Sequence, residues 1–163
     1  MHKENTTPPM YEWALFAHLA GAISFFAGLA VAAVGQTAAR RRSRPSEIAA
    51  LLGTARWGVV LVAAGLLLVL GSGFWLLDLT LYGFDAWIVA ALALLAFAVV
   101  AGGVGGQAPK RARRLAERLG REDDAPSREL ETLLHDRLAE ALNWAAAAAA
   151  VAILVLMVWK PGA

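Results

Sequence analysis

The stretch Trp57–Leu77, WGVVLVAAGLLLVLGSGFWLL, decides the fold of this chain. It contains no Asp, Glu, Lys or Arg. Its length is about the 20 residues that a helix needs to cross the roughly 30 Å hydrocarbon core of a bilayer. A helix of a soluble bundle would carry polar side chains at every turn on its outer side, and the central residues Leu61–Leu70 carry none. The stretch therefore predicts a transmembrane helix.

Three further stretches share this length and composition, and the charged residues lie between the stretches. We predict four membrane spans, at 13–35, 57–77, 86–106 and 141–159. The chain is 59% hydrophobic, above the roughly 45–50% that is usual in globular proteins, and its mean hydropathy is +0.57. We expect an all-α transmembrane four-helix bundle that forms a single membrane domain over residues 1–163.

Basic residues are unevenly distributed between the two sides of the expected bundle. Two loops, 36–56 and 107–140, contain Arg40, Arg41, Arg42, Arg44 and Arg56, and Lys110, Arg111, Arg113, Arg114, Arg118, Arg121, Arg128 and Arg137. The opposite side has only Lys3 and Lys160. The positive-inside rule places both loops in the cytoplasm and both termini outside. We therefore expect a multi-pass protein of the plasma membrane whose arginines contact anionic lipid headgroups, and not nucleic acid.

Helix signals also occur outside the spans. Pro45-Ser46-Glu47 has the features of a helix start, which predicts one helix from 46 to 77. The pattern recurs at Pro126-Ser127 and predicts one helix from there to Trp159. Between these two signals, residues 110–119 form a basic amphipathic arm. We interpret this arm either as a helix lying on anionic headgroups or as a docking surface for a partner.

Small residues recur at every seventh position in the first two spans. They are Gly21, Gly28 and Gly35 in the first span, and Gly58, Gly65 and Ser72 in the second. Seven residues return to nearly the same face of a helix, so each span carries a line of small residues. In lipid, close backbone approach holds helices together. We predict that the two small-residue lines meet in an antiparallel hairpin.

His18 is the one titratable residue well inside a predicted span, about 7 Å from the nearer interface. Ionisable groups inside the membrane are candidates for function. We consider His18 as a haem axial ligand, a copper ligand, a proton relay, or a neutral imidazole hydrogen-bonded to a neighbouring helix. Met157 is expected at a similar depth, and a His/Met set suits Cu(I). Haem and copper are therefore the two cofactors to consider, and the residues leave the choice open.

Charged residues at the membrane edge suggest an ion pair. Arg56 begins the second span at the depth where Glu140 precedes the fourth, and we predict that they pair and neutralise each other. We assign this pair a structural role.

No catalytic pattern is present in the sequence. We find no zinc-protease motif, phosphate loop, nucleophile elbow or dinucleotide fingerprint. The chain has no cysteine, which excludes disulfides, thiolate metal sites and cysteine nucleophiles. We therefore expect a protein that is not an enzyme.

Two segments resemble known membrane proteins. The first span, WALFAHLAGAISFFAGLAVA, resembles the opening of the CopD/HemJ superfamily, with a His followed by small residues and a glycine in mid-helix (His18, Gly21 and Gly28). The ending LMVWKP, Leu156–Pro161, is similar to the closing motif of an uncharacterised four-span branch of predicted integral membrane proteins. The resemblance implies a cofactor near the histidine of the first span, because characterised relatives are linked to copper uptake or haem-pathway oxidation. Only His18 matches, and the further histidine or basic groups expected of a haem-using member are missing from the other spans.

Three functions follow from these observations. The first is an accessory or partner-binding bundle, acting as a homo-oligomer or with a partner subunit through its basic cytoplasmic face. The second is a haem- or copper-binding redox protein that uses His18. The third is a transporter or channel, for which the spans offer too few polar residues.

Overall fold

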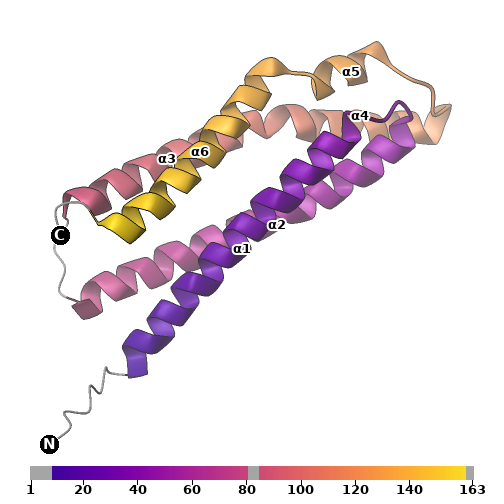
Figure 1. The fold of residues 1–163 in the computed structure, drawn as a ribbon. Coiled ribbons are helices and arrows are strands. Elements are labelled where there is room, and N and C mark those ends of the chain that lie inside the picture. Colours follow the sequence, from indigo (N-terminus) through magenta and orange to yellow (C-terminus); the bar gives the residue numbers. More distant parts are fainter. Residues whose placement is uncertain (1–8, 81–84, 161–163) are drawn as a thin grey trace, which may run out of the picture. The chain divides into compact units, whose positions relative to one another are not determined.

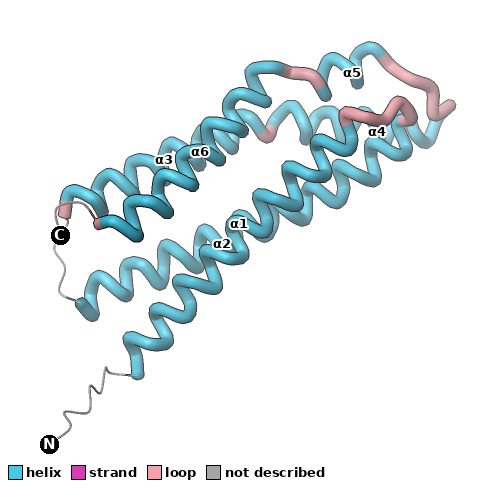
Figure 2. The backbone as a smooth tube through the Cα atoms, viewed as in Figure 1, coloured by secondary structure: helices cyan, strands magenta, loops and turns pink. Residues whose placement is uncertain are grey.

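The computed structural model describes residues 9–80 and 85–160, which form helices joined by short loops (Figure 2). Six helices follow one another in this part of the chain (Figure 1): α1 Pro9–Ala39, α2 Pro45–Thr80, α3 Ala86–Gly105, α4 Gln107–Glu122, α5 Arg128–Leu134 and α6 Arg137–Trp159. Four helical stretches are long and apolar enough to cross a membrane. The predicted all-α fold with four spanning helices is confirmed. Lys3 and residues 81–84 of the turn between the second and third spans lie outside the described residues.

The first two helices are longer than the spans predicted within them. α1 has 31 residues and α2 has 36, so each exceeds about 45 Å, compared with about 30 Å of hydrocarbon. Pro45 is the first residue of α2. At this position the fixed φ of proline suits a helix, and an N–H group would have no acceptor within the helix. The predicted continuous helix over 46–77 is confirmed.

The chain divides into two compact units. The first consists of residues 1–31 and 57–83, and the second of residues 32–56 and 84–163. Both α1 and α2 contribute residues to each unit.

In the first unit, α1 and α2 approach through backbone contacts at the small-residue lines. A Cβ atom added at Gly28 would lie 2.6 Å from the carbonyl oxygen of Gly58, and one added at Gly65 would lie 2.5 Å from the backbone nitrogen of Phe25. A Cβ at Gly21 would come within 2.9 Å of the backbone nitrogen of Val69. These gaps are too small for any side chain, so the approach depends on glycine at these positions.

The small-residue line of α1 continues into the second unit. There, a Cβ at Gly35 would lie 2.9 Å from the Cβ of Ala55. The second unit also contains α3 and α6, which pack through the alanines Ala98, Ala101, Ala146 and Ala149. Alanine side chains let these two helices approach closely along their length.

The basic loops fold into a packed structure that we call the cap, residues 36–56 and 107–140. Its core contains Ala39, Ile48, Leu52, Ala112, Leu115, Ala116, Leu130 and Leu134. These side chains come from the end of α1, the start of α2, and from α4 and α5. The arm predicted at 110–119 is α4, extended at both ends, and its apolar side is buried in this core.

The prediction of one uninterrupted helix from Pro126 to Trp159 is wrong. α5 ends at Leu134, and α6 begins at Arg137. Asp136 has an extended backbone (φ −66°, ψ 105°), and its carboxylate accepts a hydrogen bond from the N–H of Ala139. Asp136 therefore caps a new helix, whereas the leucine pattern of the sequence continues across the break.

We predict that Gly28→Leu destabilises the protein strongly. The new side chain would overlap backbone atoms of α2, and overpacking of this kind costs roughly 1–3 kcal/mol. The measurement is thermal unfolding of the detergent-purified protein. Gly71→Leu is the matched control, because a Cβ at Gly71 in α2 meets no atom within 4 Å. Equal loss of stability in both variants would contradict the backbone-contact argument.

Candidate functional site

His18 lies in the first unit, against α2. Its Nδ1 is 3.2 Å from the carbonyl oxygen of Val69 and 3.3 Å from the Oγ of Ser72. The Ser72 hydroxyl donates to the carbonyl of Leu68 at 2.5 Å, so its oxygen is left to accept. Both neighbours of Nδ1 are therefore acceptors, and Nδ1 is the ring nitrogen that carries the proton.

The protonated Nδ1 leaves Nε2 of His18 with its lone pair. Among residues 9–80 and 85–160, no hydrogen-bond partner of Nε2 is found. A histidine that binds a metal commonly donates one N–H to a backbone carbonyl and ligates through the other nitrogen. The hydrogen bond to Val69 thus satisfies one ring nitrogen of His18 and fixes the orientation of the imidazole ring.

Further ligands for a metal are few. In the described part of the chain, no group of three or more His, Cys, Asp or Glu side chains is arranged to hold a metal ion. Met157, the second ligand considered from the sequence, belongs to α6 in the other unit. Pairing of His18 with Met157 stays a prediction.

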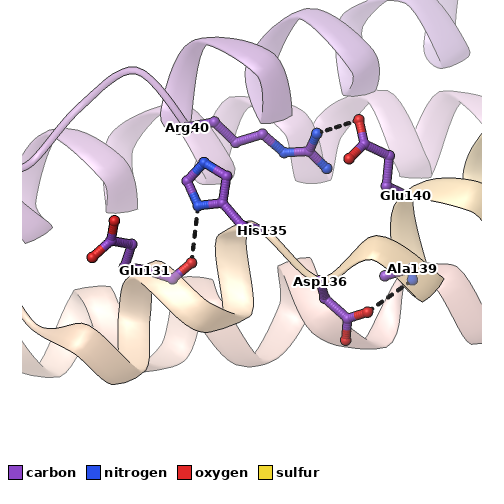
Figure 3. A network of polar contacts seen from close by, with 6 residues as sticks. All are labelled: Arg40, Glu131, His135, Asp136, Ala139 and Glu140. Carbon is purple, nitrogen blue, oxygen red and sulfur yellow. Dashed lines mark hydrogen bonds and ion pairs between the residues drawn. The ribbon is translucent and has the colours of Figure 1, made fainter.

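The second unit holds an ion pair between the end of α1 and the start of α6. The Nη1 of Arg40 lies 2.6 Å from the Oε1 of Glu140 (Figure 3). The sequence analysis predicts that Glu140 forms an ion pair, but with Arg56 as its partner. On α2, Leu52 and Ala55 are the residues turned inward, and Arg56 is exposed. Arg40, directly after α1, is the arginine that reaches Glu140.

A further hydrogen bond and a small cleft lie near this pair (Figure 3). The Nδ1 of His135 lies 3.0 Å from the carbonyl oxygen of Glu131 (Figure 3). A small cleft, about the size of one water molecule, is lined by Gln36, Arg40, Leu52, Pro109, Leu133, Leu134, Asp136, Ala139 and Asn143. A cleft of this size has no room for an organic substrate or a cofactor.

A second polar contact closes the cap at its far end. The carboxylate of Asp124 accepts hydrogen bonds from the backbone N–H and from the hydroxyl of Ser46, both at 2.7 Å. These hydrogen bonds lower the pKa of the Asp124 carboxyl, and the charge of Arg44 acts in the same direction. Asp124 therefore caps the first turn of α2 from the loop after α4. We call this contact the Ser46–Asp124 clamp.

The clamp was not predicted from the sequence. The sequence places Ser46 in a helix-start signal, but in the structure its hydroxyl donates to a carboxylate 78 positions away. Asp124 has a left-handed backbone, with φ 52°. Gly120 lies close to Ser46 as well, because a Cβ there would come within 3.2 Å of Ser46 backbone atoms. A glycine and an aspartate beside a turn are the only local signals of this contact.

The outer side of α4 is strongly basic. Arg111, Arg114 and Arg118 follow one another at helical spacing, and all three are exposed. No ion pair or hydrogen bond is found for them in the described part of the chain. On the opposite side of the same helix, Ala112, Leu115 and Ala116 are buried. We call the three arginines the basic face.

The buried underside changes the interpretation of α4. A helix that binds a bilayer through its apolar side must have that side free to enter the lipid. In α4 the apolar side packs against α5 and α2. Contact of α4 with anionic lipid would therefore rest on charge alone.

We predict that Arg40 and Glu140 are energetically coupled and that Arg56 and Glu140 are not. A double-mutant cycle with Arg40→Met and Glu140→Gln should give a coupling of about 0.5–1 kcal/mol, since both side chains keep contact with solvent. Thermal unfolding in detergent supplies the stabilities. The parallel cycle with Arg56→Met is the control, and we expect it to be additive. Coupling in the Arg56 cycle alone would favour the pair predicted from the sequence.

A comparison with known families matches nearly the whole chain. A family model described as "Predicted integral membrane protein (DUF2269)" matches residues 13–161. No curated protein and no solved structure matches this chain.

Proposed function

We propose, from the premise that this chain belongs to the DUF2269 family of predicted integral membrane proteins, that it is a non-enzymatic accessory protein whose cap docks a protein partner. The observation that carries this proposal is the basic face of α4. Three exposed arginines lie on a helix whose other side is already packed in the cap. Such a helix is held rigidly, and its charged side is presented to the surroundings.

The length of α3 supports a protein partner over lipid. α3 has 20 residues and so covers about 30 Å, the thickness of the hydrocarbon core. α4 continues in nearly the same direction beyond Gly106 (Figure 1). Arg114 and Arg118 would then lie about 14 and 20 Å beyond the end of α3. The headgroup layer adds only about 5–8 Å on each side, and charge screening acts over about 8 Å.

The distribution of basic residues supports a cytoplasmic cap. Thirteen of the 15 Lys and Arg residues lie at 36–56 and 107–140, and the positive-inside rule places such segments in the cytoplasm. We therefore propose a plasma-membrane protein with both termini outside and a cap that contacts its partner on the cytoplasmic side.

Site-specific photo-crosslinking in cells tests the docking proposal. A photoreactive residue replaces Arg114, and we expect a discrete protein adduct that is lost when Arg111 and Arg118 are changed to Gln. The matched control is the same probe at Arg41, which is basic and exposed but lies outside α4. An adduct that persists without the two arginines, or the absence of any protein adduct at Arg114, would contradict the proposal.

A second candidate function has its own observation. The oriented Nε2 of His18 favours a haem- or copper-binding redox protein, as the resemblance to the CopD/HemJ superfamily implies. Nε2 of His18 would hold the haem or copper, and the bound group would supply the electron-transfer chemistry. In this proposal Val69 and Ser72 hold the imidazole in the tautomer that ligates.

Absorption spectra and elemental analysis of the purified protein test this candidate. Under the redox proposal, wild type shows a haem band or near-stoichiometric copper, and His18→Ala loses it. The matched control is His135→Ala, a histidine in the cap that the redox proposal does not use. A colourless, metal-free wild type, or a band that survives His18→Ala, would remove His18 as a cofactor ligand.

A further inference from the structure

The charges of the second cytoplasmic loop are separated along the chain. α4 contains six basic and two acidic residues, a net charge of +4. The segment 123–140, which includes α5, contains six acidic and two basic residues, a net charge of −4. The loop as a whole is therefore neutral, but it is divided into a basic half and an acidic half.

The two halves do not neutralise each other within one chain. In the described residues, the ion pairs are Arg40–Glu140, Arg42–Glu47 and Arg113–Glu117. None of them joins α4 to the segment that follows it. Glu129 and Glu131 on α5 are exposed, as is the basic face. We call these two glutamates the acidic edge.

The buried cluster of the cap explains why these charges stay apart. Leu115 and Ala116 of α4 pack with Leu130 and Leu134 of α5. The apolar sides of the two helices therefore face each other, and their charged sides point away from the contact. α4 and α5 lie beside each other in the cap (Figure 1), so the basic face and the acidic edge belong to one small structure.

The membrane adds a geometric constraint. All copies of a membrane protein share one orientation, so their caps lie at the same height above the bilayer. The basic face of one copy is then level with the acidic edge of its neighbour. Opposite charges at the same height attract each other, and they disfavour arrangements of the two copies in which like charges meet.

We propose that the partner of the cap is a second copy of this chain, with the basic face of one copy against the acidic edge of the other. The inference rests on the proposed function, in which the cap docks a protein. A second copy presents an acidic surface at the height of α4, and in a two-fold symmetric pair the contact is made twice. The surface that complements the basic face is thus encoded in the same sequence.

Charge reversal of the full-length protein tests this inference. One variant carries Arg111→Glu, Arg114→Glu and Arg118→Glu, and the other carries Glu129→Lys and Glu131→Lys. Differently tagged copies are co-expressed and purified together in mild detergent at low salt. We expect wild type to co-purify with itself, each variant alone to lose at least about tenfold of this association, and the two variants together to recover it. A tenfold change corresponds to about 1.4 kcal/mol.

The matched control reverses Arg41 and Arg137 to Glu, two exposed arginines of the cap outside both surfaces. We expect this variant to associate as wild type does. The reversed side chains are exposed, so we expect every variant to fold. Thermal unfolding of each variant verifies this. Association should also fall as salt rises from about 0.05 to 0.5 M, since screening shortens the range of the attraction.

Several outcomes would overturn the inference. They are a wild type that does not self-associate, reversed variants that associate as well as wild type, or a mixed pair that does not recover. The photo-crosslink at Arg114 separates this inference from the proposed function. An adduct of twice the chain mass supports both, an adduct with a different protein overturns only the second-copy inference, and no protein adduct overturns both.

Discussion

The fold depends on close backbone contact between α1 and α2. In a bilayer, lipid tails are as apolar as leucine, so helices gain little from burying apolar side chains against each other. Dispersion contacts at short range stabilise the helix pair instead. Gly28 and Gly65 allow the backbones to come this close because they have no side chain. This contact sets the register in which His18 meets Val69, 51 positions along the chain.

The cap is stabilised by apolar burial, unlike the contact between α1 and α2. In water, apolar burial stabilises structure, and Ile48, Leu115 and Leu130 form an apolar core of this kind in the cap. The apolar side of α4 is buried in this core and is therefore not available for contact with lipid or a partner. The remaining surface is charged, with arginines and glutamates on separate helices. The packed interior and the divided charge pattern are the two features on which the proposal of a protein partner rests.

Much of the architecture could be predicted from the sequence because its signals are local. Uniform apolar composition marks the four spans, and the seven-residue recurrence from Gly21 to Gly35 marks a helix face. The pairing of Glu140 could not be predicted in this way. It depends on how far α2 is rotated about its axis, which turns Leu52 inward and leaves Arg56 exposed. The break at Asp136 competes with a leucine pattern that continues through it, and the local carboxylate cap determines the result.

The Ser46–Asp124 clamp has a consequence for the order in which the protein is made. Ser46 leaves the ribosome 78 residues before the carboxylate that caps it. Until Asp124 is synthesised, the N–H of Ser46 lacks this acceptor. Contacts so distant in sequence form late, after α3 has entered the bilayer and α4 has been synthesised. The clamp can therefore form only after Asp124 has been synthesised, and a chain that stops before Asp124 lacks the carboxylate that caps α2.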